Sequence, residues 1–130
     1  MAHDILDIKT VHPTKGYSHA ARAGNLLFIA GQVAKDRDDK LVGLGDVAAQ
    51  ARQIYRNLGA VLGEAGGSLS DIVKMTTYLT HSGYVETYRT VRNEFFTDPM
   101  PPNTLVICES LATPEFLMEV EATAVLGSRR

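Results

Sequence analysis

Two carboxylates stand in an otherwise apolar segment near the end of the sequence. Residues 116–126 read Phe-Leu-Met-Glu-Val-Glu-Ala-Thr-Ala-Val-Leu, and this composition predicts a strand. Residues two apart share one face of a strand, so Glu119 and Glu121 point one way while Met118 and Val120 point the other. A carboxylate on a mostly covered face of a sheet lowers the stability of the fold unless it is paired or hydrated, and its presence there can instead indicate a functional role. General acid–base catalysis on a water molecule is the chemistry that such a glutamate can perform.

The composition narrows the class of protein. The chain has 130 residues, 45% hydrophobic and 22% charged, which is typical of a globular protein with room for one domain, expected over residues 1–130. The net charge of −2 is spread along the chain, and nucleic-acid binding usually needs a basic patch, so no nucleic-acid partner is expected. The chain shows neither a secretion leader nor the ~20 apolar residues of a membrane span, so we expect a cytoplasmic protein without a membrane partner.

The remaining reactive residue types give no further site. The four histidines His3, His12, His19 and His81 lack metal-ligand spacing, so neither a metal nor a cofactor is expected. His19 lies two residues past Tyr17 and could touch the cleft, but a lone histidine in a turn is expected to be solvated. Cys108, the single cysteine, cannot form an intramolecular disulfide and is expected to be a core residue on a buried strand.

Hydrophobic periodicity predicts the elements that hold these residues. The first helix should begin after an N-cap at Asp46 and end at Gly66-Gly67, and the second should cover 83–96, before Pro99, Pro101 and Pro102. Strands are expected over 4–11 (a weak pattern), 26–33, briefly at 41–42, and over 71–80, 103–110 and 116–126.

The expected sheet is wider than two helices can cover on both faces. The strands over 26–33 and 103–110 are nevertheless apolar on both faces. A soluble protein does not leave so much apolar sheet in water, so a second subunit should cover the free face. Oligomerisation is therefore expected from the pattern alone.

The chain resembles the Rid family, also called YjgF or L-PSP proteins, over nearly its whole length. Four segments carry the resemblance, and their order and spacing make it specific. They are Gly16-Tyr17-Ser18-His19-Ala20, Leu27 to Val33 (Leu-Phe-Ile-Ala-Gly-Gln-Val), the segment Tyr88 to Phe96, and Pro101-Pro102-Asn103-Thr104 continuing to Glu119-Val120-Glu121-Ala122. The resemblance implies an α+β, chorismate-mutase-like fold with a mixed sheet and two helices on one face, a homotrimer, and ligand clefts between subunits.

The resemblance also implies a function and site residues. RidA-type members are hydrolytic deaminases of reactive enamines and imines derived from amino acids. Their tyrosine and glutamate, which handle water and protons, correspond to Tyr17 and Glu119, and their ligand-facing glycine corresponds to Gly31. The arginine that grips the substrate carboxylate in the family is replaced here by Asn103. Arg89, on the second helix, is a candidate for the missing positive charge.

The replacement at Asn103 has a predictable energetic effect. Arginine offers a carboxylate two charge-assisted hydrogen bonds, whereas asparagine offers one neutral amide. The loss should weaken binding of an amino-acid-derived imine by about 2–4 kcal/mol. Standard 2-imino acid deaminase activity is therefore not expected to transfer.

Structural interpretations remain open beside the functional ones. Glu119 could accept structural hydrogen bonds, and Tyr17 could lie at a subunit interface with its hydroxyl group hydrated. Gly31 could be a packing glycine, and Asn103 could cap the turn after Pro102. Arg89 could be a solvated helix residue that pairs with Glu86 or Asn93, and Glu121 is expected to be an ion-pair or rim residue.

Three functions follow as hypotheses. The first is a homotrimeric hydrolase or deaminase of a small enamine, imine or related nitrogenous metabolite, in which Glu119 activates water and Tyr17 assists. The second is a non-catalytic small-molecule-binding Rid protein. The third is an endoribonuclease of the L-PSP type, which the negative net charge disfavours.

Overall fold

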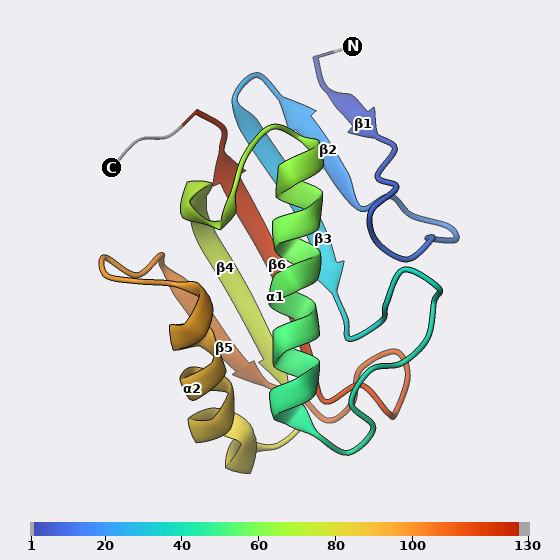
Figure 1. Ribbon diagram of the computed structural model, residues 1–130, viewed down its shortest axis with the longest axis vertical. Coiled ribbons are helices and arrows are strands. Elements are labelled where there is room, and N and C mark those ends of the chain that lie inside the picture. The colour runs from blue at the N-terminus through green and yellow to red at the C-terminus, as the bar shows by residue number, and fades with distance from the viewer. Residues whose placement is uncertain (1, 128–130) are drawn as a thin grey trace.

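The computed structural model describes residues 2–127 and contains a six-stranded sheet with both α-helices on one face (Figure 1). The strand order is β1-β2-β3-β6-β4-β5, and neighbours are antiparallel except for the parallel pair β4 and β5. The strands are β1 (Asp4–Leu6), β2 (Ala20–Ala23), β3 (Leu26–Gln32), β4 (Ile72–Leu79), β5 (Asn103–Ile107) and β6 (Met118–Val125). The predicted mixed sheet with two helices on one face is confirmed.

Both predicted helices are present, and the second begins two residues later than expected. Helix α1 (Val47–Glu64) starts at Asp46, whose carboxylate accepts a hydrogen bond from the Ala49 amide at 3.1 Å. It stops at Gly66, whose φ of +86° turns the chain so that the Gly67 amide bonds the Leu62 carbonyl at 2.8 Å. Helix α2 (Val85–Phe95) follows a 3-10 turn, η2 (Ser82–Tyr84), and another such turn, η1 (Leu69–Asp71), leads into β4.

The alternation predicted for the last strand is confirmed. Along β6, every second side chain is buried against the helices, and the residues between them, which include Glu119 and Glu121, face the other way. The buried set is Met118, Val120, Ala122 and Ala124. This register fixes both glutamates on the sheet face that carries no helix.

The strand β3 differs from its predicted burial. Leu27 and Ile29 are buried, but Leu26 and Phe28 are 40% and 46% exposed, so the strand is buried on one face rather than on both. Ile5 on β1 is also 55% exposed and pairs in register with Ala21, which pairs with Phe28. Over β1 and β3, the helix-free face therefore carries exposed apolar side chains, which a second subunit could cover.

Three local predictions were wrong. Strand β2 was missed because Ala20–Ala23 contains no β-branched or aromatic residue and forms its hairpin through Gly24-Asn25. The expected return strand at 41–42 is only an isolated bridge between Lys35 and Leu41. The weak strand over 4–11 is limited to Asp4–Leu6, because residues 9 and 10 instead donate backbone hydrogen bonds to Glu64 at the end of α1.

The other boundaries shift by a few residues. Cys108 lies just beyond β5 and is half-buried rather than in the core, with its Sγ 3.6 Å from the Leu79 carbonyl. Over residues 2–127, neither helix has the length and apolar character that would let it cross a membrane.

Candidate active site

The structure brings three of the five predicted site residues into one pocket. Tyr17, Gly31 and Glu119 line a cavity of about 400 Å³ at the end of β3. The loop before β2 supplies Tyr17, β3 supplies Gly31, and the central strand β6 supplies Glu119. The other lining residues are His12, Ala30, Val33, Lys35, Ala112, Thr113 and Phe116. Segments far apart in the sequence therefore meet at the carboxylate of Glu119.

Gly31 provides the space for that carboxylate. A Cβ atom added to residue 31 would lie 2.8 Å from Cδ of Glu119 and closer still to Oε2, so any side chain here would displace the carboxylate. The pairing of β3 with β6 is also irregular between Ile29 and Gln32, which is typical of a bulge that redirects a functional strand. Gly31 is thus a close-approach position, and an N–H at residue 31 that faces a ligand stays a prediction.

The Glu119 side chain is partly buried, and within residues 2–127 it makes no hydrogen bond or ion pair. Burial raises its pKa above the ordinary value, and the nearby Glu121 carboxylate raises it further. A carboxyl whose pKa is moved toward neutrality accepts and returns protons more readily near physiological pH. The interpretation as a structural hydrogen-bond acceptor finds no partner in this part of the chain.

Tyr17 is 52% exposed at the mouth of the pocket. Burial of the phenol raises its pKa, and the negative charge of Glu119 raises it further, while Lys35 opposes this effect. Tyr17 therefore keeps its hydroxyl proton at neutral pH and can donate it in a hydrogen bond.

A buried network holds the loop that carries Tyr17. His19 is only 4% exposed, contrary to the expectation of a solvated turn residue. Its Nε2 lies 2.7 Å from the His12 carbonyl, and its Nδ1 lies 3.0 Å from Nε2 of Gln32. The carbonyl can only accept, so Nε2 of His19 carries the proton and Nδ1 accepts from Gln32. The loop is thereby tied to β3 beside Gly31.

His12 sits at the inner end of this network. It is 2% exposed, and its Nδ1 has no hydrogen-bond partner among the described residues. Burial lowers its pKa, and the proximity of His19 and Lys35 lowers it further while Asp39 opposes this effect, so the neutral form of the ring is favoured. This ring therefore adds no formal charge to the pocket.

Glu121 is exposed on the same face of β6 as Glu119. The Tyr78 hydroxyl donates a hydrogen bond to its Oε1 at 2.9 Å. Glu121, Tyr78 and Leu111 line a second hollow of about 260 Å³ that shares Gly31 and Glu119 with the first. The Glu119 carboxylate therefore lies between two hollows, one beside Lys35 and the other beside Glu121.

The structure does not bring Asn103 and Arg89 to this pocket within one chain. Asn103 faces the helices, where its Oδ1 accepts from Thr77 at 2.8 Å and its Nδ2 donates to the Tyr88 hydroxyl at 3.3 Å. Arg89 is exposed on α2 and, within residues 2–127, bonds neither Glu86 nor Asn93. A role for either residue in a cleft between subunits stays a prediction.

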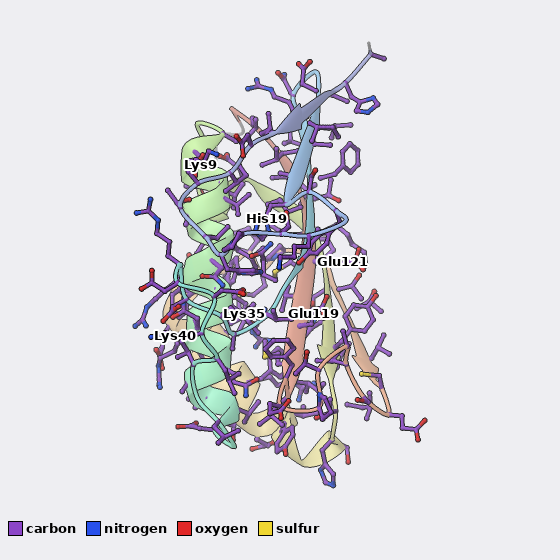
Figure 2. All side chains as sticks on the ribbon, turned by 90° about the vertical axis from the view of Figure 1, so that its right-hand side faces the viewer. Lys9, His19, Lys35, Lys40, Glu119 and Glu121 are labelled. Atoms are coloured by element: carbon purple, nitrogen blue, oxygen red, sulfur yellow. The ribbon has the colours of Figure 1, made fainter. Side chains whose placement is uncertain are left out.

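Lys35 is a charged pocket residue that the sequence did not indicate. It belongs to the charged segment 35–40, which looks like a solvated connection. The chain turns back there, with Lys35 bridged to Leu41, and the ammonium lies 5.9 Å from the centre of the Phe116 ring. Figure 2 shows Glu119 and Glu121 on β6, with Lys35 nearer to Glu119 in this view than Lys40 is.

A larger cavity of about 540 Å³ lies along the N-terminal segment. Its charged members are Asp7 and Lys9, which form an exposed ion pair at 2.9 Å, and Arg37; it contains neither Glu119 nor Tyr17. Over the described part of the chain, no three histidine, cysteine, aspartate or glutamate side chains are grouped to hold a metal ion. Chemistry is therefore concentrated at the Glu119 pocket.

Comparison with known proteins agrees with this geometry. The family model described as Endoribonuclease L-PSP matches residues 8–126. A RutC family protein of Pyrococcus abyssi is 34% identical over 120 residues, which cover 92% of this chain and 94% of that protein.

Solved structures give the same result. RidA from the Antarctic bacterium Psychrobacter sp. PAMC 21119 superimposes with a TM-score of 0.85 at 28% identity, over 94% of this chain and 98% of that one. YyfA of Yersinia pestis, a Rid family protein, superimposes with a TM-score of 0.90 at 27% identity, over 96% and 100% of the two chains. The chain therefore belongs to the Rid family, whose members are also called YjgF or L-PSP proteins.

Proposed function

We propose that this protein is a RidA-like hydrolase that cleaves the C–N bond of a small imine or enamine. One observation carries the proposal: the Glu119 carboxylate lies over Gly31, in a pocket with Tyr17, without a hydrogen-bond partner in the described chain. A carboxylate so placed is available to a water molecule and to a substrate nitrogen. Family membership supports the reaction class but does not name the substrate.

The chemistry requires only water and proton transfers. Glu119 takes a proton from water as the water oxygen attacks the imine carbon, and it delivers a proton to the nitrogen. The resulting carbinolamine loses ammonia as its hydroxyl becomes a carbonyl, so an imine and water give a carbonyl compound and ammonia. Tyr17 can donate a hydrogen bond to the attacking oxygen or to the departing nitrogen.

The proposal includes a homotrimer, in the cytoplasm, with the helix-free sheet face as its seam. Support comes from the exposed apolar residues Ile5, Leu26 and Phe28 on that face. Glu119 points to the same face, so a neighbouring subunit on this seam would close the pocket. Closure by a neighbour would also exclude water, which strengthens electrostatic effects in the site.

We do not expect standard 2-imino acid deaminase activity, because Asn103 replaces the arginine that holds the substrate carboxylate. Its amide is already bonded to Thr77 and Tyr88 within the chain. The same observation favours a second candidate, a binding protein that keeps the cleft without the chemistry.

Ammonia release tests the proposal. The purified protein is incubated with a panel of small imines and enamines, some with and some without a carboxylate, and ammonia formation is compared with the spontaneous rate. Acceleration of at least one imine supports the hydrolase. No acceleration of any, together with saturable binding of the corresponding carbonyl products, would favour the binding protein.

The name of the matched family model suggests a third activity, endoribonuclease. The net charge of −2 argues against it, because RNA binding depends on neutralising phosphates. Retention of RNA that weakens steeply with added salt would revive this candidate.

A further inference from the structure

We propose that Lys35 holds an anionic group of the ligand, such as a carboxylate, on one side of the Glu119 pocket. The inference rests on the proposed function in placing the ligand at Glu119, and it names the charge of the ligand. It adds Lys35 to Arg89 as a candidate for the missing positive charge, and Lys35 is the one that lines the pocket within a single chain.

The first argument is position. Lys35 is the one lysine or arginine among the described residues that line this pocket, which it shares with Tyr17 and Glu119. Arg89 and Asn103 do not line it. The positive charge of Lys35 also acts to lower the pKa of the Tyr17 phenol and of the His12 ring, so the ammonium is close to both groups.

The second argument is the asymmetry of charge around Glu119. The hollow on one side contains Lys35, and the hollow on the other contains the Glu121 carboxylate. An anion is attracted to the first and repelled by the second, whereas a protonated imine nitrogen has the opposite preference. A ligand with both groups would thus be oriented with its reacting carbon near Glu119.

The third argument is that Lys35 has hydrogen bonds to spare. Among residues 2–127, its one ion pair is with Asp39 at 2.9 Å, and the two side chains are 30% and 49% exposed. An ammonium group has three hydrogen-bond donors, and Asp39 occupies only one of them. Exposed ion pairs of this kind also contribute little to stability, so Lys35 remains available to bind a ligand. Asp39 instead acts as a competitor that a ligand anion must share or displace.

Pyruvate and pyruvamide are suitable probes because they have the same shape and differ in charge. Affinities are measured by NMR titration of the isotope-labelled full-length protein, with the Gly31 amide as reporter, so no turnover is needed. We expect pyruvate to bind more tightly than pyruvamide. Lys35→Met should weaken pyruvate about tenfold and leave pyruvamide within about twofold.

Two further variants test the proposal: one should increase the affinity for pyruvate, and the other is a control that should not change it. Asp39→Asn should tighten pyruvate about two- to threefold by removing the competing charge. Residue 39 has a φ of +67°, which asparagine tolerates, so the turn should persist. Lys40→Met makes the same charge change outside the pocket and should alter pyruvate binding by less than about twofold.

The outcomes separate this inference from the proposed function. Equal affinity for the two probes, unchanged pyruvate binding in Lys35→Met, an equal loss in Lys40→Met, or no binding at concentrations on the order of tens of millimolar would overturn it. Lys35-dependent pyruvate binding without release of ammonia from any imine would overturn the hydrolase and keep the anion site. If the protein releases ammonia but binds pyruvate equally well with and without Lys35, the hydrolase is kept and the anion site is overturned.

Discussion

The Glu119 carboxylate lies against the Cα atom of Gly31, in space that a Cβ atom at residue 31 would occupy. The two residues come from β3 and β6, which pair through an irregular register at this point. The absence of a side chain on one strand thus sets the place of the acidic group on the other.

Gly31→Ala should disable the site while leaving the fold intact. The φ of Gly31 is not positive, so alanine is compatible with the backbone, but its methyl group must push the Glu119 carboxylate away. We expect imine turnover to fall by about 10²-fold or more, because the carboxylate contributes as a positioned acid–base group. Ammonia release and thermal unfolding are measured on the same protein.

Gly63→Ala is the matched control for that variant. Gly63 lies in α1, and a Cβ there meets no atom within 4 Å. Alanine should stabilise the helix by about 0.5–1 kcal/mol and leave turnover unchanged. If Gly31→Ala keeps full activity, the close approach of Gly31 and Glu119 has no catalytic significance.

The raised pKa of Glu119 predicts how stability depends on pH. Its folded-state pKa lies above the unfolded value of 4.5, because of burial and then of Glu121. The folded protein therefore holds this proton more tightly, and the resulting stability is fully present below pH 4.5 and is lost as the pH rises through the raised pKa.

At neutral pH, ionisation of the partly buried Glu119 lowers the free energy of unfolding. Glu119→Gln removes this effect, because glutamine does not ionise. The variant should be at least as stable as the wild type at neutral pH, and the difference should shrink toward about pH 4. Unfolding in urea at several pH values measures it. A variant that is less stable than the wild type at neutral pH would instead indicate that Glu119 accepts structural hydrogen bonds, for example across the seam.

Asn103→Arg should give a partial gain of function at a cost in stability. Wild-type turnover of imines made from simple amino acids should be weak. Arginine at residue 103 restores the guanidinium that binds the substrate carboxylate in the family. Arginine cannot accept a hydrogen bond, so the Thr77 hydroxyl loses its partner, and we expect a loss of about 1–3 kcal/mol in the free energy of unfolding.

Asn103→Lys is the control, because it adds the charge without the planar fork and should gain less activity. Turnover of the imine derived from alanine is the measurement. Strong wild-type turnover of that imine, abolished by Lys35→Met, would mean that Lys35 alone replaces the family arginine.

Phe28→Glu should dissociate the trimer and leave a folded chain. Phe28 is 46% exposed on the helix-free face, so the substitution places a charge in the proposed seam rather than in the core. Light scattering should report roughly three times the 14.1 kDa chain mass for the wild type and a smaller species for the variant. Leu44→Glu, at a residue that is 74% exposed outside the sheet, should remain assembled. A wild-type monomer at micromolar concentration would contradict the trimer.

The parts of the fold that are encoded locally could be predicted from the sequence. The period-two pattern around Glu119 and the N-cap at Asp46 depend on neighbours a few residues away, and both agree with the structure. Strand β2 could not be predicted in this way, because its alanines gain their strand conformation from pairing with β3.

The surroundings of His19 and Lys35, which the sequence did not predict, depend on contacts between distant segments. His19 is buried because Gln32 and the His12 carbonyl satisfy its two nitrogens, and no local pattern signals that arrangement. Lys35 reaches the pocket because the chain folds back at Leu41, whereas its sequence context is that of a polar loop. Alignment by family position indicated Asn103, but the chain turns its amide toward Thr77.

The most direct test of the account is the turnover of Glu119→Gln on whichever imine the wild type hydrolyses, with Glu121→Gln as control. Both variants remove one carboxylate from the same strand face, but only Glu119 touches Gly31. We predict that Glu119→Gln lowers the rate of ammonia release by about 10²–10⁴-fold with its melting temperature preserved, and that Glu121→Gln keeps most of the rate. Unchanged turnover in Glu119→Gln would remove Glu119 from the mechanism and contradict the account.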